Sequence, residues 1–147
     1  MNDVLPLILL DLPATMDKLQ VTTRSHAEFI DITQEVNEIL EKREIKEGVC
    51  YVYVPHTTAA VTINENADPS VRKDIVNELD RLVPGNGHYT HGEGNAAAHI
   101  KATLVGSSIS VPISDGKLAL GTWQGIYFCE FDGPRRREVF VQIMKRE

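Results

Sequence analysis

The stretch that decides the fold is VCYVYVPHTTAAVTINENADP, residues 49–69. Two runs of β-branched, aromatic and small apolar residues, 49–54 and 59–64, predict strands on either side of a proline. Asp68 and Pro69 then form a typical helix start, with Asp68 as the N-cap and Pro69 at the first helical position. The stretch therefore predicts two strands and a helix in direct succession.

The rest of the chain repeats these kinds of pattern. A second helix is indicated from Thr33 by a stripe of apolar residues among charged ones. Many strands, short connections and two clear helices predict an α+β fold with antiparallel sheets. Periodicity leaves open whether the helices cover one face of a sheet or the strands form a sandwich. The other predicted strands, the first two expected to form one hairpin, are 19–23, 28–31, 107–113, 117–123, 126–131 and 139–143.

Size and charge restrict the class of protein. At 147 residues the chain fits a single domain, 1–147. Its net charge of −6 argues against a nucleic-acid partner. An apolar N-terminal arm, about 1–16, is flanked by acidic residues, lacks a basic n-region and is too short to span a bilayer. We therefore expect a cytoplasmic protein with no membrane contact, whose arm forms a strand or packs at a subunit contact.

Several reactive residues have ordinary explanations. Cys50 and Cys129 each lie in an apolar run without CxxC spacing, which favours two buried reduced thiols over a disulfide or a reactive thiol. The basic run at 135–137 indicates a solvated turn first and an anchor for an anionic group second. His26 is expected in a surface turn.

Three other histidines are candidates for chemistry: His56, His91 and His99. His91 and His99 bracket a glycine-containing loop, 92–95, and the alanines at 96–98 indicate a short helix that carries His99. Imidazole nitrogens bind divalent metal ions and also transfer protons. We expect these rings to form a metal or anion site, which binds either a divalent ion, zinc or magnesium, or an anionic substrate. General acid–base or ligand-binding histidines, and purely structural ones, stay open as alternatives.

Four further side chains could complete such a site. Glu65 is not needed as a helix or turn cap, so it is a candidate for acid–base work or for orienting a histidine. Trp123 and Gln124 lie between glycines, where the indole either fills the core or stacks on a planar ligand. Glu130 points away from its apolar neighbours, either to solvent or into a polar cavity.

These residues lie in motifs that resemble the YjbQ-like family of small proteins. The motifs are HTTAAVTINENADP at 56–69, AHIKA at 98–102, GKL at 116–118 and GTWQGIYFCEF at 121–131. The match runs from about Leu19 to the C-terminus, with the motifs in the same order.

The resemblance implies a sandwich-like, jelly-roll-like core with two main flanking helices, assembled as a homotrimer with sites near subunit contacts. It also implies a weak activity of the secondary thiamine-phosphate synthase type, which joins a hydroxymethylpyrimidine diphosphate to a thiazole phosphate. His56, His91 and His99 fall at the family's histidine cluster. The other marked segments contain Glu65, Trp123, Gln124 and Glu130.

We therefore expect an enzyme that acts on a small phosphorylated or heterocyclic substrate. A transferase that displaces diphosphate would need a metal ion or cationic histidines to offset the charge of the leaving group. The same residues could support metal-dependent hydrolysis of a phosphoester. A trimeric protein that binds a metabolite without turnover is the third hypothesis.

Overall fold

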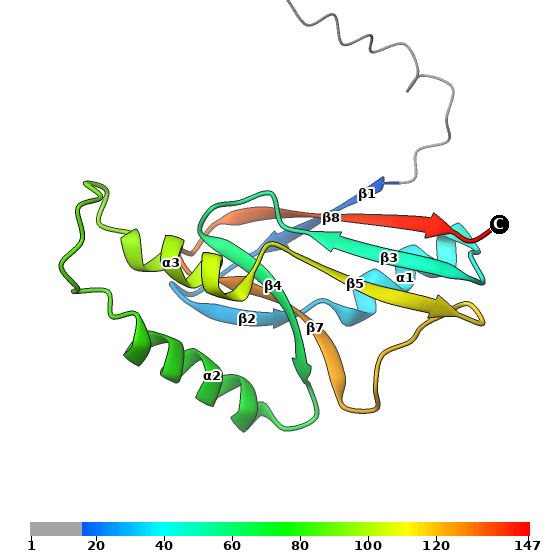
Figure 1. Cartoon of the computed structure of the whole chain (residues 1–147), viewed down its shortest axis with the longest axis horizontal. Helices are drawn as coiled ribbons and strands as arrows, with labels where there is room; N and C mark the ends of the chain where they lie inside the picture. Colours follow the sequence, from blue (N-terminus) through cyan, green and yellow to red (C-terminus); the bar gives the residue numbers. More distant parts are fainter. Residues whose placement is uncertain (1–15) are drawn as a thin grey trace, which may run out of the picture.

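A computed structural model describes residues 16–147, so the predicted N-terminal arm lies outside the described residues apart from its last position. Two antiparallel sheets and three helices make up the described chain (Figure 1). In chain order they are β1 (Met16–Thr22), β2 (Glu28–Asp31), α1 (Thr33–Arg43), β3 (Gly48–Tyr53), β4 (Ala59–Glu65), α2 (Pro69–Leu82), α3 (Ala96–Val105), β5 (Ser108–Ser114), β6 (Lys117–Leu118), β7 (Gln124–Glu130) and β8 (Arg136–Lys145).

The larger sheet has the strand order β1-β8-β3-β5-β6. Strand β8 pairs with β1 on one side and with β3 on the other, so the last strand of the chain lies inside the sheet. Its inward residues Val139, Val141 and Ile143 are buried, because they alternate with residues of the outer face.

The smaller sheet has the order β2-β7-β4 and consists of short strands around a central β7. Both faces of β7 are covered. Ile126 and Phe128 on one face belong to the main core, while Tyr127 and Cys129 on the other belong to a second cluster. Burial on both faces explains why this strand is a continuous apolar run in the sequence.

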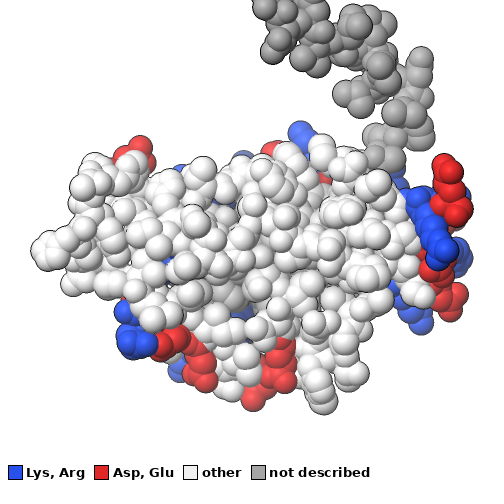
Figure 2. Space-filling view, viewed as in Figure 1, with Lys and Arg blue, Asp and Glu red and all other residues white. Residues whose placement is uncertain are grey.

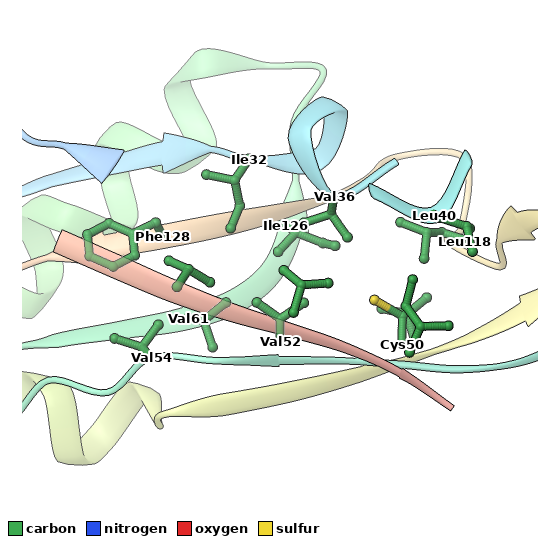
Figure 3. Packing of buried hydrophobic residues seen from close by; sticks show 14 of the residues in the cluster. Ile32, Val36, Leu40, Cys50, Val52, Val54, Val61, Leu118, Ile126 and Phe128 are labelled. Atoms are coloured by element: carbon green, nitrogen blue, oxygen red, sulfur yellow. The ribbon is translucent and has the colours of Figure 1, made fainter. Parts of the chain in front are cut away.

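The main core lies between the larger sheet on one side and α1 with the smaller sheet on the other (Figure 3). Helix α1 and its N-cap residue contribute a stripe at the helical spacing, Ile32, Val36 and Leu40, of which none is more than 2% exposed. The charged residues of the helix lie outside this buried stripe, as the sequence predicts.

Helices α2 and α3 follow the smaller sheet in the chain and pack on its other face. Ala98 and Ala102 of α3, and Ile75 and Leu79 of α2, contact the second cluster. The predicted start of α2 is confirmed, since the Asp68 carboxylate accepts a hydrogen bond from the Ser70 amide at 2.9 Å. Small side chains let α3 lie close to β4.

The α+β class and the antiparallel sheets are confirmed, and three details of the prediction are wrong. The first two strands do not form a hairpin, because β1 pairs with β8 and β2 with β7. The strand predicted at 117–123 is only two residues long, and its remainder is a loop. Residues 96–105 form a third helix of ten residues, longer than the alanines alone indicate. None of the helices in residues 16–147 is long and apolar enough to cross a membrane.

Removing the largest fully buried side chain tests this core. Phe128 is 0% exposed, so Phe128→Ala should lower the free energy of unfolding by about 3–5 kcal/mol through lost apolar contact and a cavity. Leu82 is 58% exposed at the end of α2, and Leu82→Ala is the matched control with a change below about 0.5 kcal/mol. Denaturant unfolding measures both. Equal effects of the two variants would contradict the assigned core.

Candidate functional site

A groove of about 460 Å³ brings two of the three candidate histidines together. It lies where the loop after β3 meets α3 and the residues just before β5. We call it the imidazole groove. Its lining consists of His56, Thr57, Ala59, His99, Ala102, Thr103, Gly106 and Ser107.

The third histidine lies beside His99 and forms a pair with it. The rings of His91 and His99 meet edge to face, with centroids 5.2 Å apart and an angle of 86° between their planes. His99 is half-buried in the first turns of α3, while His91 is exposed in the preceding loop. Glu93 is close to His91, with Oε2 3.9 Å from Nε2. The glycine-containing loop that the two histidines bracket therefore brings His91 back to His99.

His56 has a different environment from this pair. Its Nε2 accepts a hydrogen bond from the backbone N–H of Glu138 in β8, at 3.0 Å. Burial lowers the pKa of His56 below its ordinary value, and the positive charge of Arg137 lowers it further. The neutral ring is therefore the favoured form near pH 7.

Beneath His56 lies a buried ion pair between Glu130 of β7 and Arg137 of β8. Arg137 donates from Nε to Oε2 of Glu130 at 2.8 Å and from a terminal nitrogen to Oε1 at 2.6 Å. A terminal nitrogen of Arg137 also donates to the hydroxyl of Thr58 at 2.8 Å, and the Thr23 hydroxyl donates to Oε2 of Glu130 at 2.9 Å. The pair thus connects the residue that follows β1, the loop before β4, β7 and β8.

Two sequence interpretations are corrected by this network. Glu130 is 0% exposed and faces neither solvent nor a cavity, because its oxygens accept from Arg137, Thr23 and the amides of Phe131 and Asp132. Arg137 is 5% exposed and does not lie in a solvated turn. Burial alone would raise the pKa of Glu130, but the hydrogen bonds it accepts outweigh burial and hold that pKa below its ordinary value.

The remaining predicted residues lie at the other end of the smaller sheet. Glu65 ends β4 and pairs with Gln124, the first residue of β7. Strand β4 has seven residues, so this end is about 20 Å from the imidazole groove. Trp123 is 62% exposed in the loop before β7, and so it does not fill the core. The structure therefore does not bring Glu65, Trp123 and Gln124 to the histidines.

A second hollow lies near that end and differs chemically from the groove. It measures about 930 Å³, lies between α1 and β6, and includes Asn66, whose backbone N–H donates to the carbonyl of Trp123 at 2.9 Å. Four of its lining residues are acidic, namely Asp31, Glu35, Glu38 and Glu41. A surface with this charge repels phosphate groups.

The histidines fit a metal ion only in part. Imidazoles suit zinc, and His91 and His99 are close together, but zinc sites usually hold three or four protein ligands. Within residues 16–147 no group of three or more His, Cys, Asp and Glu side chains is arranged to hold a metal ion. Asn95 provides one further polar atom, since its Oδ1 is buried without a hydrogen-bond partner in the described chain. Two imidazoles would need water, substrate or another subunit to complete a coordination sphere.

Sequence reasoning missed the hydrogen-bonding residues around the groove. Thr58 and Thr23 were not singled out, and Arg137 was assigned first to a solvated turn, although it shares the inward face of β8 with Val139 and Val141. This alternation was a usable signal. The Glu138 amide leaves no trace in the sequence, because every residue except proline has such a donor.

Both cysteines are buried free thiols, which confirms their predicted state. Burial raises the pKa of Cys50 to about 11 and also raises that of Cys129. Each therefore remains a protonated thiol near neutral pH, and neither lines the groove.

The chain has close relatives across bacteria and archaea. A family model described as "UPF0047 protein YjbQ-like" matches residues 17–146. A UPF0047 protein of Methanocaldococcus jannaschii is 54% identical over 127 residues, which cover 86% of this chain and 92% of the relative.

Solved structures share the fold. A crystal structure of an uncharacterized YjbQ/UPF0047 protein from Clostridium acetobutylicum has a TM-score of 0.86 and 52% identity, covering 87% of this chain and 99% of that one. A YjbQ-like protein of unknown function from Sulfolobus solfataricus also has a TM-score of 0.86, at 36% identity. The match covers 89% of this chain and 96% of that one. The two-sheet architecture is therefore kept among relatives of widely different identity.

The pKa directions of His56 and Glu130 predict two steps of acid destabilisation. Each folded pKa lies below the unfolded value, so each group's stabilising contribution is present above the unfolded pKa and is lost as the pH falls through the folded one. The first step, from His56, starts below about pH 6.5, and the second, from Glu130, below about pH 4.3. Denaturant unfolding between pH 7 and pH 3 measures both.

Variants of the two residues show which residue causes each step of acid destabilisation. His56→Gln should remove the first, while Glu130→Gln should remove the second and cost about 3 kcal/mol at pH 7, because Arg137 then lacks its buried counter-charge. Glu78→Gln, which loses an exposed ion pair with Arg81, is the matched control and should change little. If Glu130→Gln were as stable as wild type at pH 7, the assigned role of the pair would be wrong.

Proposed function

The chain belongs to the UPF0047 protein YjbQ-like family, and we propose that it is a small cytoplasmic enzyme that binds a phosphorylated or heterocyclic substrate in the imidazole groove. The activity we propose is a transfer of the secondary thiamine-phosphate synthase type. The jelly-roll-like description of the core stays a prediction.

The observation that carries the proposal is the convergence of His56 and His99 on one groove, with the ring of His91 packed edge to face with that of His99. Hydroxyls of Thr57 and Ser107 line the same groove. Imidazoles and hydroxyls can donate to phosphoryl oxygens and to the ring nitrogens of a heterocycle. Small side chains such as Ala59 leave room for a planar group between them.

Charge determines which group would stabilise a departing diphosphate. The lining residues of the groove include no lysine or arginine, and the guanidinium of Arg137 is bound to Glu130 beneath it. Compensating charge would therefore come from protonated His91 or His99, or from a divalent ion, zinc or magnesium, held by that pair. Such an ion would supply Lewis acidity when bound. The groove's own residues would orient the substrate and limit access of water.

One observation favours a second candidate function. None of the described residues that line the groove is a carboxylate, because Glu65 lies at the far end of β4 and Glu130 is held by Arg137. General acid–base work would then depend on histidine alone. A protein that binds the same small metabolite without turnover needs no carboxylate, so we keep this as the alternative.

We also propose a homotrimer whose subunit contacts use the outer face of the larger sheet. Tyr51, Tyr53 and Met144 are 42%, 47% and 56% exposed on that face. Figure 2 supports this, since charged side chains are sparse across the middle of the face it shows and lie mainly around its margin. Large exposed apolar patches mark interaction surfaces. Tyr53 pairs with Ser108, next to Ser107 of the groove, so such a contact would lie beside the site.

Loss of one ring tests the site. His99→Ala should keep the fold but reduce zinc affinity by tenfold or more in calorimetry and abolish product formation, because His99 belongs to both the ring pair and the groove. The assay supplies both phosphorylated substrates, with and without a chelator. Coupled product supports the transferase, free phosphate a hydrolase, and saturable binding without product the alternative. His26→Ala is the control, as an exposed histidine outside the groove; equal behaviour of the two variants would exclude His99 from the site.

A charge on the apolar face tests the assembly. Wild-type protein should have three times the 16.4 kDa mass of one chain in light scattering, and Tyr53→Arg should reduce it towards one chain, because a cation would be buried in the contact. Leu82→Arg, on exposed α2, is the matched control and should stay trimeric. A monomeric wild type, or a trimeric Tyr53→Arg, would contradict this interface.

A further inference from the structure

We propose that His56 is held as its neutral Nδ1–H tautomer and serves the groove as a hydrogen-bond donor, not as a metal ligand. Its role towards a ligand rests on the proposed function, whereas its tautomer is a property of the folded chain alone. His56 would then donate a hydrogen bond to the ligand, while His91 and His99 would provide charge or hold a metal ion.

Strand pairing between β3 and β8 ends close to His56. The ladder between β3 and β8 stops at Tyr53 and Phe140, and Pro55 turns the chain away before it can pair with Glu138. The Glu138 amide would lack a partner on this side of the strand. Nε2 of His56 accepts from it at 3.0 Å, in place of the missing strand carbonyl.

This hydrogen bond determines where the proton of the ring lies. A backbone amide can only donate, so Nε2 must offer its lone pair. A neutral imidazole has one proton, which must then be on Nδ1. Metal ions also need a nitrogen lone pair, and the single lone pair of this tautomer is already used. His56 therefore cannot join His91 and His99 as a ligand while the Glu138 bond persists.

The surrounding contacts make this geometry a fixed one. On one side of His56, the Val54 amide donates to the carbonyl of Ser107 at 2.8 Å. On the other side, the hydroxyl of Thr58 accepts from Arg137, the residue before Glu138 in β8. The positive charge of Arg137 also disfavours a second cation at His56.

The donor selects a class of ligand atom. An N–H at fixed position favours an acceptor, namely a phosphoryl oxygen, a carbonyl or an unprotonated ring nitrogen. It disfavours a protonated amine, which has only donors. His56 would thus orient the substrate, while the His91–His99 pair provides any charge compensation.

Nitrogen-15 NMR of the histidine rings in the full, zinc-free chain tests the tautomer. We expect the His56 ring to show a protonated Nδ1 and an unprotonated Nε2 at pH 7.5. His56→Gln identifies its signals, and its side-chain carbonyl can accept from the Glu138 amide in place of Nε2. A protonated Nε2 in wild type would overturn the inference, whether or not any ligand binds.

Titration with zinc chloride tests whether the His91–His99 pair binds the metal ion and His56 does not. We expect His56→Gln to bind zinc within twofold of wild type and His99→Ala to lose tenfold or more, with the ring nitrogens of His56 unchanged in the wild-type spectra. Equal losses in both variants, or a metal-bound His56 nitrogen, would overturn the inference. If wild type binds no zinc, the metal clause of the proposed function fails, and the zinc-free spectrum alone decides the tautomer.

Discussion

The pairing of Glu130 with Arg137 is the constraint on which the site depends. Two opposite charges are taken out of water where the smaller sheet, the larger sheet and two loops meet, with side-chain exposures of 0% and 5%. Burying such ions is costly, and the cost is offset only when nearly every donor and acceptor is used. Thr23, Thr58 and two backbone amides fill the remaining positions. The network therefore stabilises one relative placement of the strands.

That placement determines what the groove can offer. Arg137 holds Thr58, and the next residue of β8 holds the ring of His56, so one strand positions both sides of the loop after β3. The groove is then closed by α3, whose alanines allow the helix to lie close to β4 and which carries His99. Its chemistry thus comes from positions fixed by buried contacts, although its polar atoms are side chains of a loop and a helix.

The sequence predicted where helices and strands lie better than it predicted which strands pair with each other. Alternation and caps identify most strands and α2, but pairing is decided by distant residues, which is why β1 joins β8 rather than β2. Glu130 was assigned to solvent or a cavity because one face of a strand usually is exposed. β7 is central and covered on both faces, so its polar residue had to be buried and paired. Neighbours in the motifs at 121–131 also lie at opposite ends of that strand.

The three histidines also show what the sequence does not reveal, namely which ring atoms are already hydrogen-bonded in the folded chain. Residue type and motif order can bring His56, His91 and His99 into one hypothesis, because all three rings have the same chemistry in isolation. Their surroundings separate them. His91 and His99 meet each other without a backbone donor on either ring among the described contacts, whereas a strand amide takes the lone pair of His56. The Nε2 of His56 accepts from a strand amide, but the Nδ1–H of the same ring can still donate. The groove has no lysine or arginine in its lining, so His56 gives it a fixed hydrogen-bond donor without adding a charge.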